Sequence, residues 1–172
     1  MKRFWLFLPS IMLLAISCVN PDSTGYPLIV IDTFHPGAGG YNDTLLALVD
    51  ATGATLVTDD NGNPDQADNL GFSRITYTKG LASGDYYIKI NNPEGLGDGY
   101  YVIRVLTTDP DSIFPTVAAV NELTDRDDEV GADGLPLRPV TIKLGELISR
   151  RLYPVATDVD WFVVNLPEVM VP

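Results

Sequence analysis

The chain has 172 residues, 45% of them hydrophobic and 20% charged, which is the composition of one globular domain and excludes a disordered protein. The 23 acidic residues outnumber the 11 Lys and Arg, so the formal net charge is −12. This excess of negative charge repels phosphate groups and argues against nucleic-acid binding. The single cysteine excludes an internal disulfide.

Residues 1–17 have the pattern of a cleaved signal peptide. Lys2 and Arg3 precede an apolar run over residues 4–16, which is shorter than the roughly 17 to 25 residues of a transmembrane helix. Cys18 follows Ser17, and a small residue directly before a cysteine resembles the bacterial lipobox, whose thiol is acylated. We therefore expect cleavage before Cys18 and attachment of acyl chains such as palmitate. The open alternative is an ordinary signal with a chance cysteine.

Residues 18–27 are rich in polar residues, proline and glycine, and we expect them to form a tether between the lipid anchor and the folded domain. Several acyl chains give durable membrane attachment, whereas one chain gives only a marginal hold. Val19 follows Cys18, and its resemblance to enterobacterial sorting signals favours the outer membrane over the inner one. The expected location is the bacterial cell envelope.

Residues 28–106 alternate apolar and polar positions, which predicts strands and not helices. Asp50 to Gly53 is a turn signal between two of these strands and predicts a hairpin. Short strands separated by turn-rich segments predict an all-β fold, an antiparallel β-sandwich of the jelly-roll kind. The expected strands cover residues 28–34, 44–49, 54–58, 73–78, 86–90 and 100–106.

Residues 107–139 are predicted to be an acidic connection, with at most one helical turn near residues 117–123. Two more strand patterns follow at residues 140–144 and 160–166, so we expect residues 140–172 to supply a strand pair. The favoured interpretation is that this pair completes the sandwich in cis, because Trp161 and Phe162 would otherwise lack a core. A second, truncated copy of the domain and pairing with another chain are the alternatives.

Several short motifs follow one another in a fixed order: Asp43 to Asp50, Gly53, Asp59-Asp60-Asn61, Ser73-Arg74-Ile75 and Gly84 to Ile90. Together they resemble the bacterial pre-peptidase C-terminal (PPC) domain, a β-sandwich appended to secreted peptidases and other surface proteins. In that family an Asp-x-Asp-Trp-Phe motif usually precedes these strands, whereas here it follows them, at Asp158 to Phe162. The resemblance implies a permuted or truncated domain with an accessory role.

The loop after the third expected strand is rich in oxygen ligands, of which Ca²⁺ takes six to eight. The spacing begins like an EF-hand loop, but Pro64 stands where that loop needs glycine. Calcium is therefore a candidate ligand, and a turn capped by its own side chains is the alternative. No other cofactor is expected, since zinc would need cysteine and histidine sets. The candidate ligands are Asp59, Asp60, Asn61, Asn63 and Asp65, with Asp68 and Asn69 nearby.

A catalytic site has little support in the sequence. His35 is the only histidine, and no glycine-serine-glycine elbow surrounds Ser73. We therefore assign no catalytic residue and expect the protein not to be an enzyme. A secreted hydrolase that uses His35 and Ser73 is the alternative, as is a remnant of a longer PPC-containing surface protein.

Two tyrosine pairs place one ring on each face of a strand. We expect Tyr86 and Tyr101 to point inward, and Tyr87 and Tyr100 to form an exposed aromatic patch that stacks on sugars or anchors a protein. The alternative is that these rings only stabilise the sheet through cross-strand pairs. The leading hypothesis is a lipid-anchored, non-catalytic module that contacts surface polysaccharide, matrix or another envelope protein.

Overall fold

The computed structural model describes residues 25–37, 42–62, 71–108 and 129–168. Within these ranges the chain forms strands and no helix, so no described helix could cross a membrane. The expected signal at residues 1–17, Cys18 and most of the tether lie outside the described residues, as does the helical turn expected near residues 117–123. The strands are β1 Ile29–Phe34, β2 Leu45–Val49, β3 Thr55–Asp60, β4 Arg74–Tyr77, β5 Gly84–Asn91, β6 Tyr100–Leu106, β7 Val140–Thr141, β8 Leu147–Arg151 and β9 Val159–Leu166.

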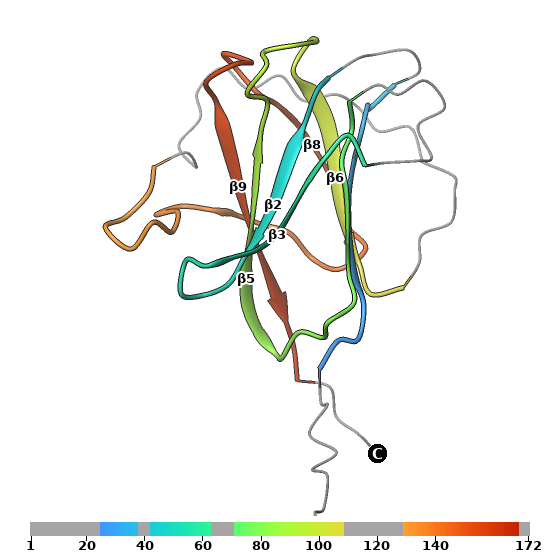
Figure 1. Cartoon of the computed structure of the whole chain (residues 1–172), viewed down its shortest axis with the longest axis vertical. Helices are drawn as coiled ribbons and strands as arrows, with labels where there is room; N and C mark the ends of the chain where they lie inside the picture. The colour runs from blue at the N-terminus through green and yellow to red at the C-terminus, as the bar shows by residue number, and fades with distance from the viewer. Residues whose placement is uncertain (1–24, 38–41, 63–70, 109–128, 169–172) are drawn as a thin grey trace, which may run out of the picture.

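These strands form two sheets that pack face to face (Figure 1). One sheet has the order β4-β1-β6-β8 and the other has the order β3-β2-β5-β9-β7. All neighbouring strands are antiparallel except β7 and β9, which are parallel over two residues. The predicted all-β sandwich is therefore confirmed.

Side chains that alternate along the strands form the core between the sheets. Leu46 and Leu48 on β2 and Ile88 and Ile90 on β5 are fully buried. The predicted hairpin joins β2 to β3. Its turn is closed by the Asp50 carboxylate, which accepts hydrogen bonds from the backbone N–H groups of Thr52 at 2.9 Å and Ala54 at 3.0 Å. All of these hydrogen bonds lie within the turn itself, so the short turn sequence is enough to predict it.

The C-terminal segment supplies three strands, not the expected pair. β9 pairs with β5 over eight residues, and β8 pairs with β6 in the other sheet. Because β8 and β9 lie in different sheets, they do not pair with each other. The sequence pattern did not predict β8, because this strand lies at the edge of its sheet and has only one buried residue, Ser149. Its last two residues are Arg150 and Arg151.

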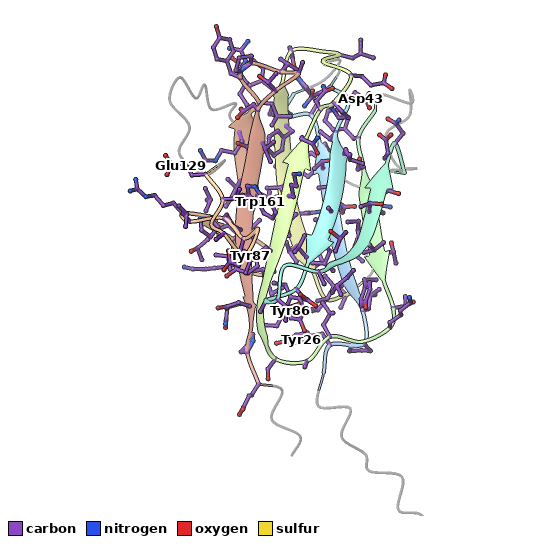
Figure 2. All side chains as sticks on the ribbon, turned by 60° about the vertical axis from the view of Figure 1, so that its left-hand side comes forward. Tyr26, Asp43, Tyr86, Tyr87, Glu129 and Trp161 are labelled. Atoms are coloured by element: carbon purple, nitrogen blue, oxygen red, sulfur yellow. The ribbon has the colours of Figure 1, made fainter. Side chains whose placement is uncertain are left out.

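The described end of the expected acidic connection folds onto the outer face of the five-stranded sheet. Val130 and Pro136 form an isolated bridge, and the Gly131 N–H donates to the Leu135 carbonyl at 2.7 Å. Leu135 packs against a small cluster formed by Ala47, Val49 and Trp161. Figure 2 shows Trp161 and Tyr87 close to the segment that begins at Glu129.

Both ends of the described chain lie at the same end of the sandwich. The Tyr26 hydroxyl donates to the Pro167 carbonyl at 3.2 Å, and the two segments meet at the lower end of Figure 1. We call this end the terminal pole. The loops of residues 92–99 and 152–158, and His35 at the end of β1, lie at the opposite end, which we call the loop pole.

Candidate functional site

His35 and Ser73 do not form a catalytic pair in the structure. Ser73 is fully buried, and its hydroxyl donates to the Thr44 carbonyl. The His35 ring is bound elsewhere: Nε2 lies 3.2 Å from the Asp98 carboxylate, and Nδ1 accepts from the Gly37 N–H at 3.1 Å. Ser73 therefore holds strands together, and a nucleophile in this position would have no access to substrate.

The candidate calcium loop is only partly described, because Asn63 and Asp65 lie outside the described residues. The Asp59 carboxylate accepts hydrogen bonds from the backbone N–H groups of Gly62 at 2.9 Å and Arg74 at 2.8 Å. Asn61 has a φ of 63°, a left-handed conformation that asparagine tolerates in turns. In the described ranges, no group of three or more His, Cys, Asp or Glu residues is placed to hold a metal ion. The calcium site stays a prediction.

The prediction that Tyr87 and Tyr100 form one aromatic patch is wrong, because the two residues belong to different sheets. Tyr87 lies on β5 and packs on the outer face of the five-stranded sheet with Trp161. Tyr100 lies on β6 in the four-stranded sheet, so the two rings face opposite sides of the sandwich. The inward prediction holds for both inner tyrosines: Tyr101 is fully buried, and Tyr86 is partly buried and packs against the same core.

The Asp-x-Asp-Trp-Phe motif has structural contacts at each position. The Asp158 carboxylate accepts from the Tyr153 N–H at 2.5 Å and so closes the turn before β9. Asp160 is fully buried and accepts a hydrogen bond from the Tyr101 hydroxyl, which links the two sheets through the core. Phe162 packs edge to face on Tyr101 with ring centroids 6.5 Å apart. The motif therefore joins β9 to the core and supplies no exposed acid pair.

A second buried carboxylate lies at the loop pole, which Figure 2 shows at the opposite end from Tyr26. Asp43 is 5% exposed, and its Oδ1 atom is buried with no hydrogen-bond partner among the residues that the structure describes. Burial raises the pKa of Asp43, and the nearby charges of Asp60 and Glu94 raise that pKa further. No described cation offsets these charges at Asp43.

A stack of three side chains lies at the same pole. The Arg151 guanidinium lies between two rings, with Cζ 4.9 Å from the Tyr100 centroid and 5.2 Å from the Tyr153 centroid. We call these three residues the Tyr-Arg-Tyr stack. The Arg151 Nε–H donates to the Asp98 carbonyl at 3.1 Å, and the Tyr100 N–H donates to the Asp98 carboxylate at 3.0 Å. Asp98 is therefore hydrogen-bonded to two members of the stack, Tyr100 and Arg151, and also to His35.

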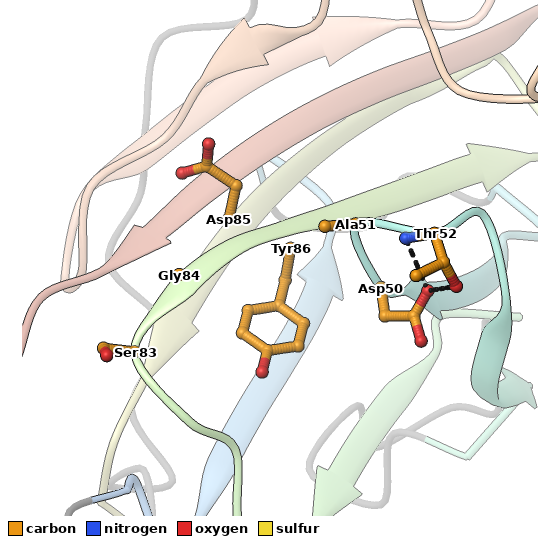
Figure 3. A pocket seen from close by; sticks show the side chains of 7 residues that line it. All are labelled: Asp50, Ala51, Thr52, Ser83, Gly84, Asp85 and Tyr86. Carbon is orange, nitrogen blue, oxygen red and sulfur yellow. Dashed lines mark hydrogen bonds between the residues drawn. The ribbon is translucent and has the colours of Figure 1, made fainter.

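An open depression of about 220 Å³ lies beside the β2–β3 turn and the start of β5 (Figure 3). Its two carboxylates are already engaged, Asp50 by its own turn and Asp85 by the Asn165 side chain at 2.7 Å. Hydrogen bonds from Thr52 and Ala54 lower the pKa of Asp50, and burial raises the pKa of Tyr86. These groups serve local structure, so the depression is a weaker candidate than the Tyr-Arg-Tyr stack.

Sequence reasoning did not single out Asp98, Arg151 or Tyr153. Arg151 stands next to Arg150 as an isolated basic pair, and Tyr153 belongs to no period-two pattern. Only the pairing of β8 with β6 brings Arg151 beside Tyr100. Comparisons of the chain with protein-family models, with curated proteins and with solved structures gave no match.

Proposed function

We propose that the protein is a lipid-anchored, non-catalytic module of the bacterial cell envelope, held to a membrane near its terminal pole and directed outward through its loop pole. The observation that carries the proposal is the position of the two chain ends. Tyr26 and Pro167 are hydrogen-bonded at one pole, so a chain entering there leaves the loops of the other pole accessible.

The sequence before Tyr26 supports a short attachment at that pole. From Cys18 the chain takes eight residue steps to Tyr26, which span at most roughly 28 Å when fully extended. Acylation of Cys18 would hold the terminal pole within that distance of the membrane surface. The loop pole then faces away from the lipid, where a partner can reach it.

The chemistry of the described residues supports a role without catalysis. Ser73 is fully buried, and His35 is engaged by Gly37 and Asp98. Asp160 of the Asp-x-Asp-Trp-Phe motif is buried and accepts a hydrogen bond from the Tyr101 hydroxyl across the core. These groups hold the sandwich together, so binding through exposed loops is the function they leave available.

The anchor is tested by labelling cells with an alkyne analogue of palmitate and measuring the mass of the N-terminal peptide of the full chain. We expect an acylated N-terminus that begins at Cys18, loss of the label in Cys18→Ala, and normal labelling in the matched control Ser23→Ala. An N-terminus at another residue, or label that persists in Cys18→Ala, would contradict the proposal.

The orientation is tested by placing a photo-crosslinking amino acid at one exposed position of each pole. Glu94 is exposed at the loop pole and Ser83 is exposed near the terminal pole. We expect crosslinks to envelope material from position 94 and few from position 83. Equal or reversed yields would show that the loop pole is not the contact surface.

A further inference from the structure

The Tyr-Arg-Tyr stack lies where β6 begins and β8 ends, beside two loops that are fitted closely together. A Cβ at Gly99 would come within 2.5 Å of the Leu152 carbonyl oxygen, and a Cβ at Gly95 would come within 2.8 Å of the Ala156 Cβ. Glycine at these two positions lets the loops of residues 92–99 and 152–158 touch. The stack is therefore preorganised, which lowers the entropic cost of binding a ligand.

One ring of the stack is open to solvent. Tyr153 is 53% exposed, while its backbone N–H is bound by Asp158 and its ring lies against Arg151. The Asp98 side chain, 44% exposed, stands beside the stack and is held by Tyr100 and His35. An exposed aromatic ring next to a fixed carboxylate offers an apolar platform together with a hydrogen-bond acceptor.

The size and charge of the loop pole decide which partner fits. Of the large apolar side chains that are exposed in the described ranges, only Leu96 and Tyr153 lie at this pole. A stable protein interface needs about 800 Å² on each partner with an apolar centre, which two side chains do not supply. The exposed Asp60 and Glu94 and the net charge of −12 repel polyanions. Among the described residues, the loop pole therefore best fits an uncharged ligand of small footprint.

We propose that the Tyr-Arg-Tyr stack, with Asp98, binds a neutral polysaccharide. The apolar face of a sugar ring stacks on Tyr153, and the Asp98 carboxylate accepts hydrogen bonds from sugar hydroxyl groups. This inference rests on the proposed function, since it names the partner of the loop pole.

The test is retention of the full chain, purified in detergent, on beads of three neutral polysaccharides, namely cellulose, curdlan and mannan, with anionic alginate beads for comparison. We expect retention on at least one neutral polysaccharide and none on alginate. Tyr153→Ala should weaken that retention about tenfold, the loss of one aromatic stacking contact. The matched control is Leu137→Ala, which removes a 61% exposed side chain remote from the loop pole and should change retention less than twofold.

Thermal melting of both variants checks that a loss of retention is not a loss of folding. Because each replaced side chain is exposed, both variants should melt like the wild type. Retention on alginate alone, no retention on any neutral bead, or equal retention of the wild type and Tyr153→Ala would overturn the proposal. Crosslinking of position 94 to proteins only would also overturn it while leaving the lipid anchor and the orientation intact.

Discussion

Two buried aspartates at different places in the molecule have different neighbours. Asp160 lies in the core between the sheets, fully buried, and accepts a hydrogen bond from the Tyr101 hydroxyl. Asp43 lies at the loop pole, 5% exposed, and the charges of Asp60 and Glu94 lie near it. Burying a polar group costs free energy unless a partner replaces water. The Tyr101 hydroxyl offsets part of this cost at Asp160, whereas the acidic neighbours of Asp43 add to the cost of its ionised form.

The largest effect expected within the core region is that of Phe162→Ala. Phe162 is fully buried and packs on Tyr101, so its truncation leaves a cavity that costs about 3 to 5 kcal/mol of unfolding free energy. Urea unfolding measures this loss. The matched control is Asn165→Ala, an exposed position on the same strand, which should change stability by no more than about 0.5 kcal/mol. A small loss at Phe162 would mean that β9 does not belong to the core.

A smaller loss is expected when only the partner of Asp160 is changed. Tyr101→Phe removes the hydroxyl that donates to Asp160 and should cost about 1 to 3 kcal/mol. Tyr100→Phe is the control on the outer side of the same strand, and its cost should stay below about 0.5 kcal/mol. Equal losses from both variants would remove the distinction between the inner and the outer tyrosine.

The contact between Tyr101 and Asp160 also predicts how the stability of the protein changes at alkaline pH. Burial, and after it the Asp160 charge, raises the pKa of Tyr101 well above its usual value. In the unfolded chain tyrosine loses its proton near pH ~10, so above that pH the unfolded state binds fewer protons than the native state. This contribution to stability is fully present below pH ~10 and is lost as the pH rises toward the folded pKa. Urea unfolding between pH ~8 and ~11 should show a smaller loss in Tyr101→Phe than in the wild type.

The smallest expected effect is a gain in stability, and it concerns Asp43 at the loop pole. The pKa of Asp43 is raised by burial and by its acidic neighbours, while the unfolded residue titrates near ~3.9. Its contribution to stability is fully present below that pH and is lost as the pH rises through the folded pKa. Asp43→Asn should therefore stabilise the protein at pH 7, and the gain should shrink toward pH 3. Thermal melting at both pH values measures it, with the exposed Glu129→Gln as control; destabilisation at pH 7 would show that the Asp43 charge has a partner.

Much of the fold could be predicted because strand alternation and turn chemistry are local properties. The period-two patterns of β1 to β6 and of β9 and the Asp50 turn place the right side chains on one face of each strand. β8 could not be predicted in the same way, because an edge strand that is only partly buried needs little alternation.

The candidate site was less predictable than the fold. Alternation with Tyr101 predicts that Tyr100 points outward, but it does not predict which side chains lie beside Tyr100. Arg151 and Tyr153 reach it only through the pairing of β6 with β8, about 50 residues further along the chain. The expected partner Tyr87 lies on the opposite outer face for the same reason, since β5 and β6 are consecutive strands in different sheets.

The sequence by itself determined that the chain is an all-β sandwich, that β2 and β3 form a hairpin, and which tyrosine of the second pair points inward. The tertiary structure alone decided which sheet each strand joins, and so that Asp160 would meet Tyr101 while Asp43 would lie near the charges of Asp60 and Glu94. The physical reason is range: alternation arises within a few residues of backbone, whereas strand order arises from the joint burial of side chains far apart in the chain.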